Sequence, residues 1–318
     1  MTAVTGQVVS RASREAYRDR LVTLMARDER VVCLDSDTGL FTGVDFGQAA
    51  RRYLNLGISE QNLMGSAAGL ARGGRMPFVN TMAAFASSRA VEAVKIDIAL
   101  NRVPVRIVAT HGGLSAGHLG PTHHCLEDLA VMRALPNMTV VVPADASATE
   151  ELIAQSLDHD GPVYFRLGRH ATAELGRGGP VELGRAQRLA EGDDVTVVAC
   201  GTEPVRFALE AADELAAEGV RATVLNTHTV KPLDAEAVLD AASTTRGVVT
   251  VEEAWRAGGL GSAVLEVLAD AGLAVPVTRV GVADRFVSGT GKHLGLLARA
   301  GVTTAAVADA ARAVVSGR

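Results

Sequence analysis

The chain has 318 residues, 48% hydrophobic and 3% aromatic, and a formal net charge of −5. Its length favours two domains, because a single core rarely grows beyond about 250 residues. No run of Lys or Arg supports nucleic-acid binding, and we expect neither a membrane-spanning stretch nor a signal peptide, which favours a cytoplasmic protein.

Short β-branched runs alternate with longer Ala- and Leu-rich stretches, a pattern typical of βαβ units and mostly parallel sheets. The first half predicts strands at residues 31–35, 77–81, 105–110, 139–143 and 163–167, and helices near 10–27, 60–72, 87–100, 125–134 and 147–158. Ser147 and Glu150 have the spacing of a capping box at the start of the last of these helices.

The same rhythm restarts after a Gly-containing stretch at residues 171–193. Strands are predicted at 195–201, 222–227, 247–253 and 276–282, with helices at 203–218 and from about 260, a short helix between the second and third strands, and two more at the end. We therefore expect two doubly wound α/β domains, a first one over residues 1–180 and a second one over 190–318.

The three cysteines are widely spaced and lack the CxxC pattern. A disulfide framework or a zinc site is therefore not expected, and Cys33, Cys125 and Cys200 are predicted to be small core residues.

Polar clusters follow the predicted strands of the first half, at residues 35–38, 111–124 and 166–170 and in the loop before Glu60. Ligands of doubly wound sheets bind beyond the carboxyl ends of the strands, so the chemistry is expected in the first domain. Considered alone, Ser59 could simply cap a helix and Glu60 complement its dipole.

Four of the eight histidines fall within fourteen residues, at His111, His118, His123 and His124. A single histidine is more often structural, but four on one strand-end loop favour a functional site. A metal site is disfavoured because the spacing is irregular and adjacent side chains point apart.

Several blocks in the first half resemble the pyrimidine-binding domain of transketolases, namely GISEQN, PFVNTMAAFASS, THGGLSAGHLGPTHH, LPNMTVVVPADASATE and GPVYFRLGR. The later blocks VKPLD, VEEAWRAGGLGSAV and DRF resemble the C-terminal domain of the same family. The resemblance implies a thiamine-diphosphate-dependent transferase of carbohydrate metabolism that moves a two-carbon ketol unit from a ketose or ketose phosphate to an aldose-type acceptor.

On this resemblance, Glu60 matches the glutamate that hydrogen-bonds N1′ of the aminopyrimidine ring and favours the tautomer that removes the C2 proton. Phe85 and Met82 match positions that pack against this ring, although aromatic residues are more usual at the second. Ser88 replaces a further aromatic, and Asp37 matches an aspartate on the cofactor side.

The resemblance also implies substrate contacts. His111 and His123 match histidines that bond the donor's oxygens, and His118 and His124 are further substrate-binding candidates on the same loop. Arg169 matches an arginine that binds the substrate phosphate.

Two departures from the family pattern change the expectation. Leu119 replaces an aspartate that binds a sugar hydroxyl, which predicts a less hydroxylated donor or acceptor. No additional phosphate-binding Arg or Ser is recognised near the N-terminus.

The segment that holds Mg²⁺ on the diphosphate, Gly-Asp-Gly…Asn in the family, is also not found, and residues 288–293 offer Gly and Lys but no carboxylate. The resemblance therefore implies a partner chain that carries the diphosphate and the Mg²⁺, in an A₂B₂ heterotetramer.

Several alternatives remain open at this stage. They are a 1-deoxyxylulose-5-phosphate synthase-like enzyme, a subunit of a 2-oxo-acid-decarboxylating thiamine enzyme, and a non-catalytic assembly subunit. A nicotinamide oxidoreductase is disfavoured because no GxGxxG follows the first strand.

Overall fold

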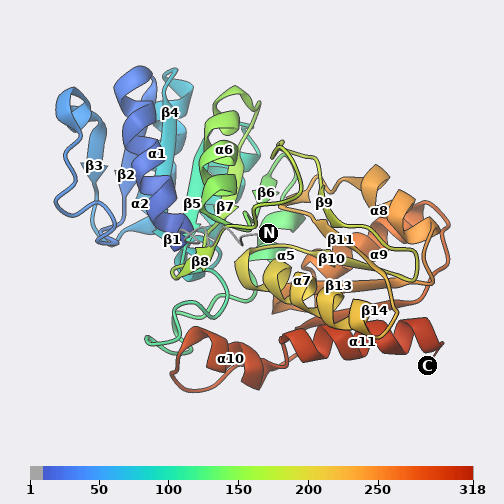
Figure 1. The fold of residues 1–318 in the computed structure, drawn as a ribbon. Coiled ribbons are helices and arrows are strands. Elements are labelled where there is room, and N and C mark those ends of the chain that lie inside the picture. Colours follow the sequence, from blue (N-terminus) through green and yellow to red (C-terminus); the bar gives the residue numbers. More distant parts are fainter. Residues whose placement is uncertain (1–9, 318) are drawn as a thin grey trace, which may run out of the picture.

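Two open sheets organise the protein, and the computed structural model describes residues 10–317 (Figure 1). The first sheet has the strand order β12 (Thr229–Lys231), β6 (Thr139–Val141), β7 (Val163–Arg166), β5 (Arg106–Thr110), β4 (Met76–Met82), β2 (Val31–Asp35) and β3 (Tyr53–Asn55). The second has the order β14 (Val277–Val282), β13 (Val248–Trp255), β10 (Val195–Ala199), β11 (Ala222–Asn226) and β9 (Gln187–Ala190). Within both sheets only the edge strands β12 and β9 run antiparallel to their neighbours.

Helices cover both faces of the first sheet. They are α1 (Ser13–Arg27), α2 (Glu60–Arg72), α3 (Ala83–Ala86), α4 (Val91–Ala93), the π-helical turn η2 (Val94–Ala99), α5 (Asp128–Ala134) and α6 (Ala146–Gln155). Alternate residues of β2 face opposite sides: Val31 and Cys33 pack with α1 and α6, whereas Val32 and Leu34 pack with α2. This two-sided burial confirms the predicted doubly wound fold.

The second sheet is covered in the same way by α7 (Thr202–Ala217), α8 (Ala235–Ser243), α9 (Leu260–Asp270), α10 (His293–Ala300) and α11 (Thr304–Ser316). Val197 of β10 packs with α7 and α11, whereas its neighbour Val198 packs with α8 and α9. The cluster that contains Val198 continues to Leu63 of α2, so the two domains share one core. All three cysteines are buried there or in the adjoining clusters, as predicted.

Two local predictions need correction. Asp145, not Ser147, caps α6, because its Oδ1 accepts a hydrogen bond of 2.7 Å from the Ala148 amide. The single helix predicted near residues 87–100 is instead the succession of α4 and η2, in which a wider turn accommodates an extra residue.

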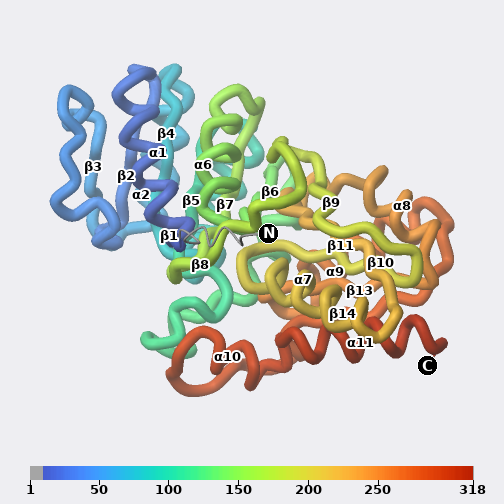
Figure 2. Tube along the Cα trace, in the orientation of Figure 1, coloured from blue at the N-terminus to red at the C-terminus, as the bar shows by residue number. Residues whose placement is uncertain are grey.

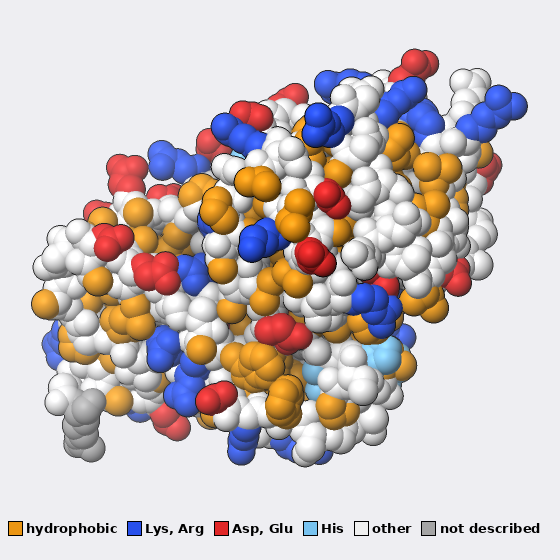
Figure 3. All heavy atoms as spheres, turned by 180° about the vertical axis from the view of Figure 1, so that it is seen from behind, with side chains coloured by type: hydrophobic (Ala, Val, Ile, Leu, Met, Phe, Trp, Pro, Cys, Tyr) orange, Lys and Arg blue, Asp and Glu red, His pale blue; other side chains and the backbone are white. Residues whose placement is uncertain are grey.

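One stretch, His293–Ser316, is long and apolar enough to be compared with a membrane span, which was not expected from the sequence. It does not form one continuous helix, because Gly301 adopts φ +82° between α10 and α11. Of its most apolar part, 44% is buried inside the protein. On the face shown in Figure 3, charges of both signs and hydrophobic side chains are interspersed without a broad basic patch.

Two long-range strand pairings tie the chain together, one of them between the two halves. Strand β12 comes from the second half but pairs with β6 of the first sheet. Strand β1 (Ser10–Ala12) pairs with β8 (Ala171–Ala173), so the start of the described chain lies between the sheets (Figure 2). The proposed domain boundary at residues 180–190 falls between β8 and β9, although β9 already begins at Gln187.

Candidate functional site

The predicted polar clusters meet at one edge of the first sheet. Strands β2, β4, β5 and β7 are parallel neighbours, so their carboxyl ends lie side by side. The register pairs Asp35 with Asn80, Met82 with Thr110, and Ala109 with Arg166. The loops that follow these strands therefore share one edge, as the sequence predicted.

Asp35 is the centre of the hydrogen-bond network that shapes this edge. Its buried carboxylate accepts bonds from Asn80 Nδ2 at 2.7 Å, Tyr53 Oη at 2.9 Å and Thr38 Oγ1 at 3.0 Å. Asp35 is thus structural. Asp37, the predicted cofactor-side residue, is exposed, with φ +61°.

Glu60 is the first residue of α2 and only 1% exposed. The hydroxyl of Ser59 does not cap this helix, because it donates instead to the Leu56 carbonyl at 2.9 Å. Arg89 donates to Glu60 Oε2 at 2.8 Å. The carboxylate opens into a cavity of about 710 Å³ that Arg89 and residues of η2 also line.

Phe85 lies close to this pair. The guanidinium carbon of Arg89 is 4.5 Å from the centroid of the Phe85 ring, and the His123 ring approaches the same ring edge-on at 5.4 Å. Arg89 therefore links Glu60 to Phe85, and Phe85 in turn contacts His123. No sequence motif singled out Arg89. It stands in the segment where the regular helix was wrongly expected.

The other residues assigned to the ring lie around this group. Met82 is half-buried at the end of β4, and its backbone precedes the first turn of α3. Ser88 is exposed, and its hydroxyl donates to the Ala84 carbonyl. Ser88, Phe85 and His124 line a smaller cavity of about 150 Å³ with Trp255 of the second domain.

His111 is buried and has a strained backbone. Its φ of +61° is rare for a residue with a side chain and costs roughly 1–2 kcal/mol; such strain often marks functional positions. Thr110 Oγ1 lies 3.0 Å from His111 Nδ1. Burial, and then the nearby Arg14 and Arg169, lower the pKa of His111 to about 3. The ring is therefore neutral near pH 7.

Arg169 has a neighbour that the sequence did not reveal. The β1–β8 pairing places Ala12 opposite Ala171, so Arg14 and Arg169, each two residues further along, come together at the same end. Burial, and then Arg169, lower the pKa of Arg14. Local sequence patterns do not place a second arginine here, because only this long-range pairing brings Arg14 to Arg169.

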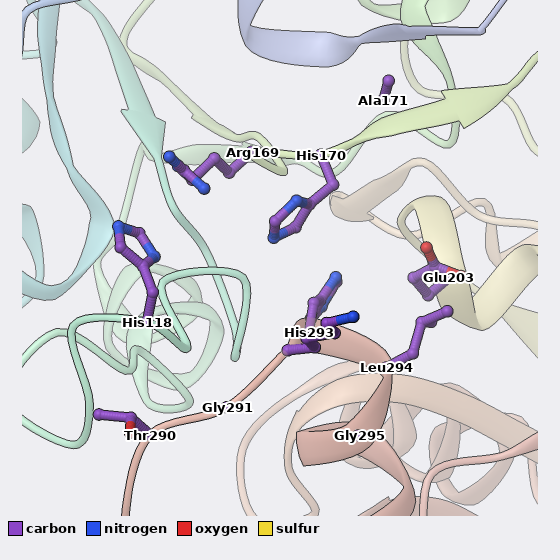
Figure 4. Close-up of a pocket in the computed structure, with 11 residues that line it drawn as sticks. His118, Arg169, His170, Ala171, Glu203, Thr290, Gly291, His293, Leu294 and Gly295 are labelled. Carbon is purple, nitrogen blue, oxygen red and sulfur yellow. The ribbon is translucent and has the colours of Figure 1, made fainter.

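The other histidines and arginines that the sequence suggested for the site lie in different environments. His118 and Arg169 line the same cavity of about 870 Å³ (Figure 4). His124 is 9% exposed and lies apart from that cavity, and neither ring nitrogen has a hydrogen-bond partner within residues 10–317. Arg166, from the predicted cluster at residues 166–170, is buried against Asp128 at 3.1 Å and is structural.

Comparison with known proteins decides the family. The chain matches the transketolase pyrimidine-binding domain over residues 10–174 and the transketolase C-terminal domain over residues 184–307. The chain belongs to the transketolase family. It is a transketolase-type subunit of the thiamine-diphosphate-dependent transferases, which confirms the resemblance seen in its motifs.

Its relatives include transketolase subunits of similar length. The 6-deoxy-6-sulfo-D-fructose transketolase subunit of Clostridium sp. strain MSTE9 is 42% identical over 276 residues, covering 86% of this chain and 85% of the relative. An apulose-4-phosphate transketolase subunit of Phocaeicola vulgatus is 38% identical over 286 residues, covering 89% of this chain and 91% of the relative.

A solved structure described as a split gene transketolase, inactive beta4 tetramer, has 43% identity and a TM-score of 0.88, covering 96% of this chain and 98% of the other. Longer relatives also match. The 1-deoxy-D-xylulose-5-phosphate synthase of Thermomicrobium roseum is 41% identical over 279 residues, but these cover only 44% of that protein.

The residues at this edge fit the ring end of the transketolase cofactor. A nearly buried carboxylate suits a ring nitrogen that shares a proton, and a half-buried phenyl ring suits the face of a pyrimidine. In contrast, no group of three His, Cys, Asp or Glu side chains in residues 10–317 is placed to hold a metal ion. The chemistry of Glu60 and Phe85 thus fits the heterocyclic end of the cofactor.

Proposed function

We propose that this transketolase-type subunit acts with a partner chain to transfer a two-carbon ketol unit from an anionic ketose to an aldose-type acceptor. The observation that supports this most directly is the nearly buried Glu60 carboxylate at the sheet edge it shares with His111, His123 and Arg169. Such a transfer requires a carboxylate that shares a proton with the cofactor ring, hydrogen-bonding groups for sugar oxygens and cations for an acidic group.

Each residue has a defined task in this proposal. Bound thiamine diphosphate would supply a carbanion that adds to the ketose carbonyl. Glu60 would hold a proton at N1′ of the aminopyrimidine, with Phe85, and to a lesser extent Met82 and Ser88, lining the ring. Asp37 is proposed to contact the cofactor from the end of β2.

His111 and His123 are proposed to orient the sugar. Because Thr110 Oγ1 occupies His111 Nδ1, the neutral ring leaves Nε2 to bond a substrate oxygen. His123 lies on the histidine loop, residues 111–124, and packs edge-on against Phe85, so we propose that it lies beside the pyrimidine ring. We also propose that His118 and His124 belong to the substrate side of the site, His118 directly through the cavity that it lines with Arg169.

We propose that the ketose carries a phosphate or a sulfonate. Arg169 and Arg14 lie together without an acidic partner in residues 10–317, and a planar guanidinium matches such an oxyanion. The relatives named for sulfofructose and apulose phosphate also act on acidic sugars. Leu119, 40% exposed where the family has an aspartate, predicts a substrate with fewer hydroxyl groups at that position.

The partner is proposed to bind the diphosphate and Mg²⁺ in a cytoplasmic A₂B₂ heterotetramer. The relatives are named as subunits, and a chain 43% identical forms a tetramer described as inactive. Buried, unpaired cysteines agree with a reducing compartment. By itself, this chain is therefore expected to assemble without turnover.

The proposal is tested by reconstitution. The chain is mixed with a partner that carries the diphosphate-binding half, Mg²⁺ and thiamine diphosphate, and a ketose phosphate, a ketose sulfonate and pyruvate are offered separately. Consumption of a ketose with release of a shortened aldose supports ketol transfer. Consumption of pyruvate alone would contradict it and favour the decarboxylating or 1-deoxyxylulose-5-phosphate synthase-like alternative, and no turnover with any donor would favour an assembly role.

A further inference from the structure

The cavity that His118 and Arg169 line lies at the junction of the two domains. It has a volume of about 870 Å³. The first domain contributes His118, Arg169 and His170, and the second contributes residues 290–295, which lead into α10 (Figure 4). Residues 288–293 stood out in the sequence for their Gly and Lys, but they have no role in the proposed reaction.

Two cationic side chains, Arg169 and Lys292, line this cavity. Arg169 and Lys292 make no salt bridge with any residue in the described range 10–317. Glu203 is the one acidic side chain in the described lining, and Arg206 already pairs with it at 2.6 Å. Unpaired cations that face a common space repel each other, and an anionic ligand would relieve that repulsion.

Three histidines also line the cavity, and they offer ring nitrogens for hydrogen bonds to a ligand. The rings of His170 and His293 stack with centroids 5.3 Å apart, and Figure 4 shows them facing each other in the middle of the cavity. His293 Nε2 lies 2.8 Å from Glu253, which fixes its ring. His118 lies across the cavity from them, beyond Arg169 (Figure 4).

Contacts between the domains hold the cavity in shape. The Gly291 amide donates to the Gly117 carbonyl at 3.0 Å, and the Leu114 amide donates to Glu253 Oε1 at 2.5 Å. A Cβ added at Gly117 would lie 2.6 Å from the Gly291 carbonyl, so glycine is needed for this close approach. The histidine loop is thus bound to the second domain and the cavity is preformed.

The amino end of α10 faces the same space. His293, Leu294 and Gly295, the first turn of this eight-residue helix, line the cavity, and Lys292 stands at the N-cap without a capping side-chain bond. First-turn amides have no partner inside their helix and favour anions, above all where cationic side chains surround them.

We propose that this cavity is an anion subsite built by both domains, in which Lys292 and the amino end of α10 join Arg169 and His118 in binding a tetrahedral oxyanion, the phosphate or sulfonate of an acidic sugar. The inference rests on the proposed function for the sugar, but the subsite itself is a property of this chain. It makes Lys292 of the second domain a determinant of specificity.

Calorimetric titration of the purified full-length chain tests the subsite. Inorganic phosphate, methanesulfonate, a sugar phosphate and the matching neutral sugar are the probes. We expect the anions to bind, the sugar phosphate more tightly than inorganic phosphate, and the neutral sugar not to bind. Tighter binding of free phosphate than of the sugar phosphate would assign the cavity to the free ion and overturn the substrate subsite.

Variants separate the second domain's contribution from that of the first. Lys292→Gln should weaken anion binding by about tenfold, the usual effect of one charge-assisted hydrogen bond. Lys95→Gln, at an exposed lysine of η2 that does not line the cavity, is the matched control and should change nothing. If Arg169→Gln weakens binding but Lys292→Gln does not, the first domain binds the anion alone and the proposal is wrong.

Chemical labelling locates the site independently, since the chain has three lysines, Lys95, Lys231 and Lys292. Pyridoxal phosphate condenses with a lysine amine with loss of water, and borohydride then reduces the imine to a stable secondary amine. We expect labelling at Lys292 in preference to Lys95, protection by excess phosphate, and no preference with pyridoxal, which lacks the phosphate. Equal labelling without protection would overturn the subsite.

These experiments do not depend on turnover. Absence of anion binding would remove the subsite while ketol transfer by the reconstituted complex could still be observed. Anion binding without ketol transfer would keep the subsite and reject the proposed reaction.

Discussion

The two ends of the proposed active site differ in whether their charged side chains are paired within the chain. At the Glu60 end, one nearly buried carboxylate is neutralised within the chain by Arg89. At the other end, Arg14, Arg169 and Lys292 have no acidic partner in residues 10–317. A paired carboxylate shapes a site, whereas unpaired cations around a cavity attract an anion from outside. In the proposed function, activation of the cofactor and recognition of the substrate's charge are therefore assigned to separate ends of the site.

The largest effect is expected from Glu60→Gln, which keeps the shape of the side chain but removes its ability to hold a proton at the ring. We expect kcat of the reconstituted complex to fall by about 10²–10⁴-fold, the usual contribution of a positioned proton-transfer group. Phosphate affinity of the isolated chain should not change, because Glu60 lies outside the cationic cavity. Steady-state kinetics and calorimetry measure the two quantities.

Arg89→Gln is the matched variant for this prediction. It removes the partner of Glu60 and the cation over Phe85 but leaves the carboxylate in place. Its kcat should therefore fall less than that of Glu60→Gln. If the Glu60→Gln enzyme kept nearly full kcat, then Glu60 would not be the residue that holds the proton at the cofactor ring.

A smaller effect, on KM, is expected at the cationic end. Arg169→Gln should raise KM for a phosphorylated ketose by about 10–100-fold, because a hydrogen bond to a charged group contributes roughly 1.5–3 kcal/mol. KM for the corresponding neutral ketose should hardly change. Initial rates over a range of both donors measure this difference.

Arg27→Gln provides the control for this experiment. Arg27 is exposed at the last turn of α1, about 20 Å along the helix from Arg14, and makes no salt bridge in the described part of the chain. Equal increases in KM for both donors would show that Arg169 shapes the site rather than binds the anion.

The sequence predicted what local patterns determine. Alternating β-branched and Ala-rich runs predicted both sheets, and motif order identified Glu60, His111 and Arg169 at the strand ends. The start of α6 was misplaced because Ser147 and Glu150 satisfy the capping pattern, while Asp145, at the extended position before them, is the residue that accepts the amide bond.

Long-range contacts were beyond such patterns. Arg14 joins Arg169 only through the β1–β8 pairing, which involves two short and largely exposed strands with no hydrophobic signature. Arg89 lies in the turn between α3 and α4, where a regular helix was expected, so periodicity gave no correct position for its side chain. Lys292 depends on how the domains pack, which neither half of the sequence encodes separately.

The smallest effect is expected at His111, which lies near Arg14 and Arg169. Its pKa is lowered to about 3 in the folded chain by burial and then by Arg14 and Arg169, against about 6.5 in the unfolded chain. Between these values the unfolded chain binds more protons, so the stability that the neutral ring contributes is complete above about pH 6.5 and is lost as pH falls. His111→Asn should reduce this loss by on the order of 2 kcal/mol near pH 4.5, as measured by urea unfolding at that pH and near pH 7.

Asparagine is the appropriate replacement because it tolerates the φ of +61° at this position. His293 provides the opposite case: burial alone would lower its pKa, but the charge and hydrogen bond of Glu253 outweigh burial and raise it. The stability contributed by His293 is therefore complete below about pH 6.5 and is lost as pH rises through the raised value. His111→Asn could instead lose as much stability in acid as the unaltered chain. In that case the fold would not resist protonation of His111, and Arg14 and Arg169 would not act electrostatically on its ring.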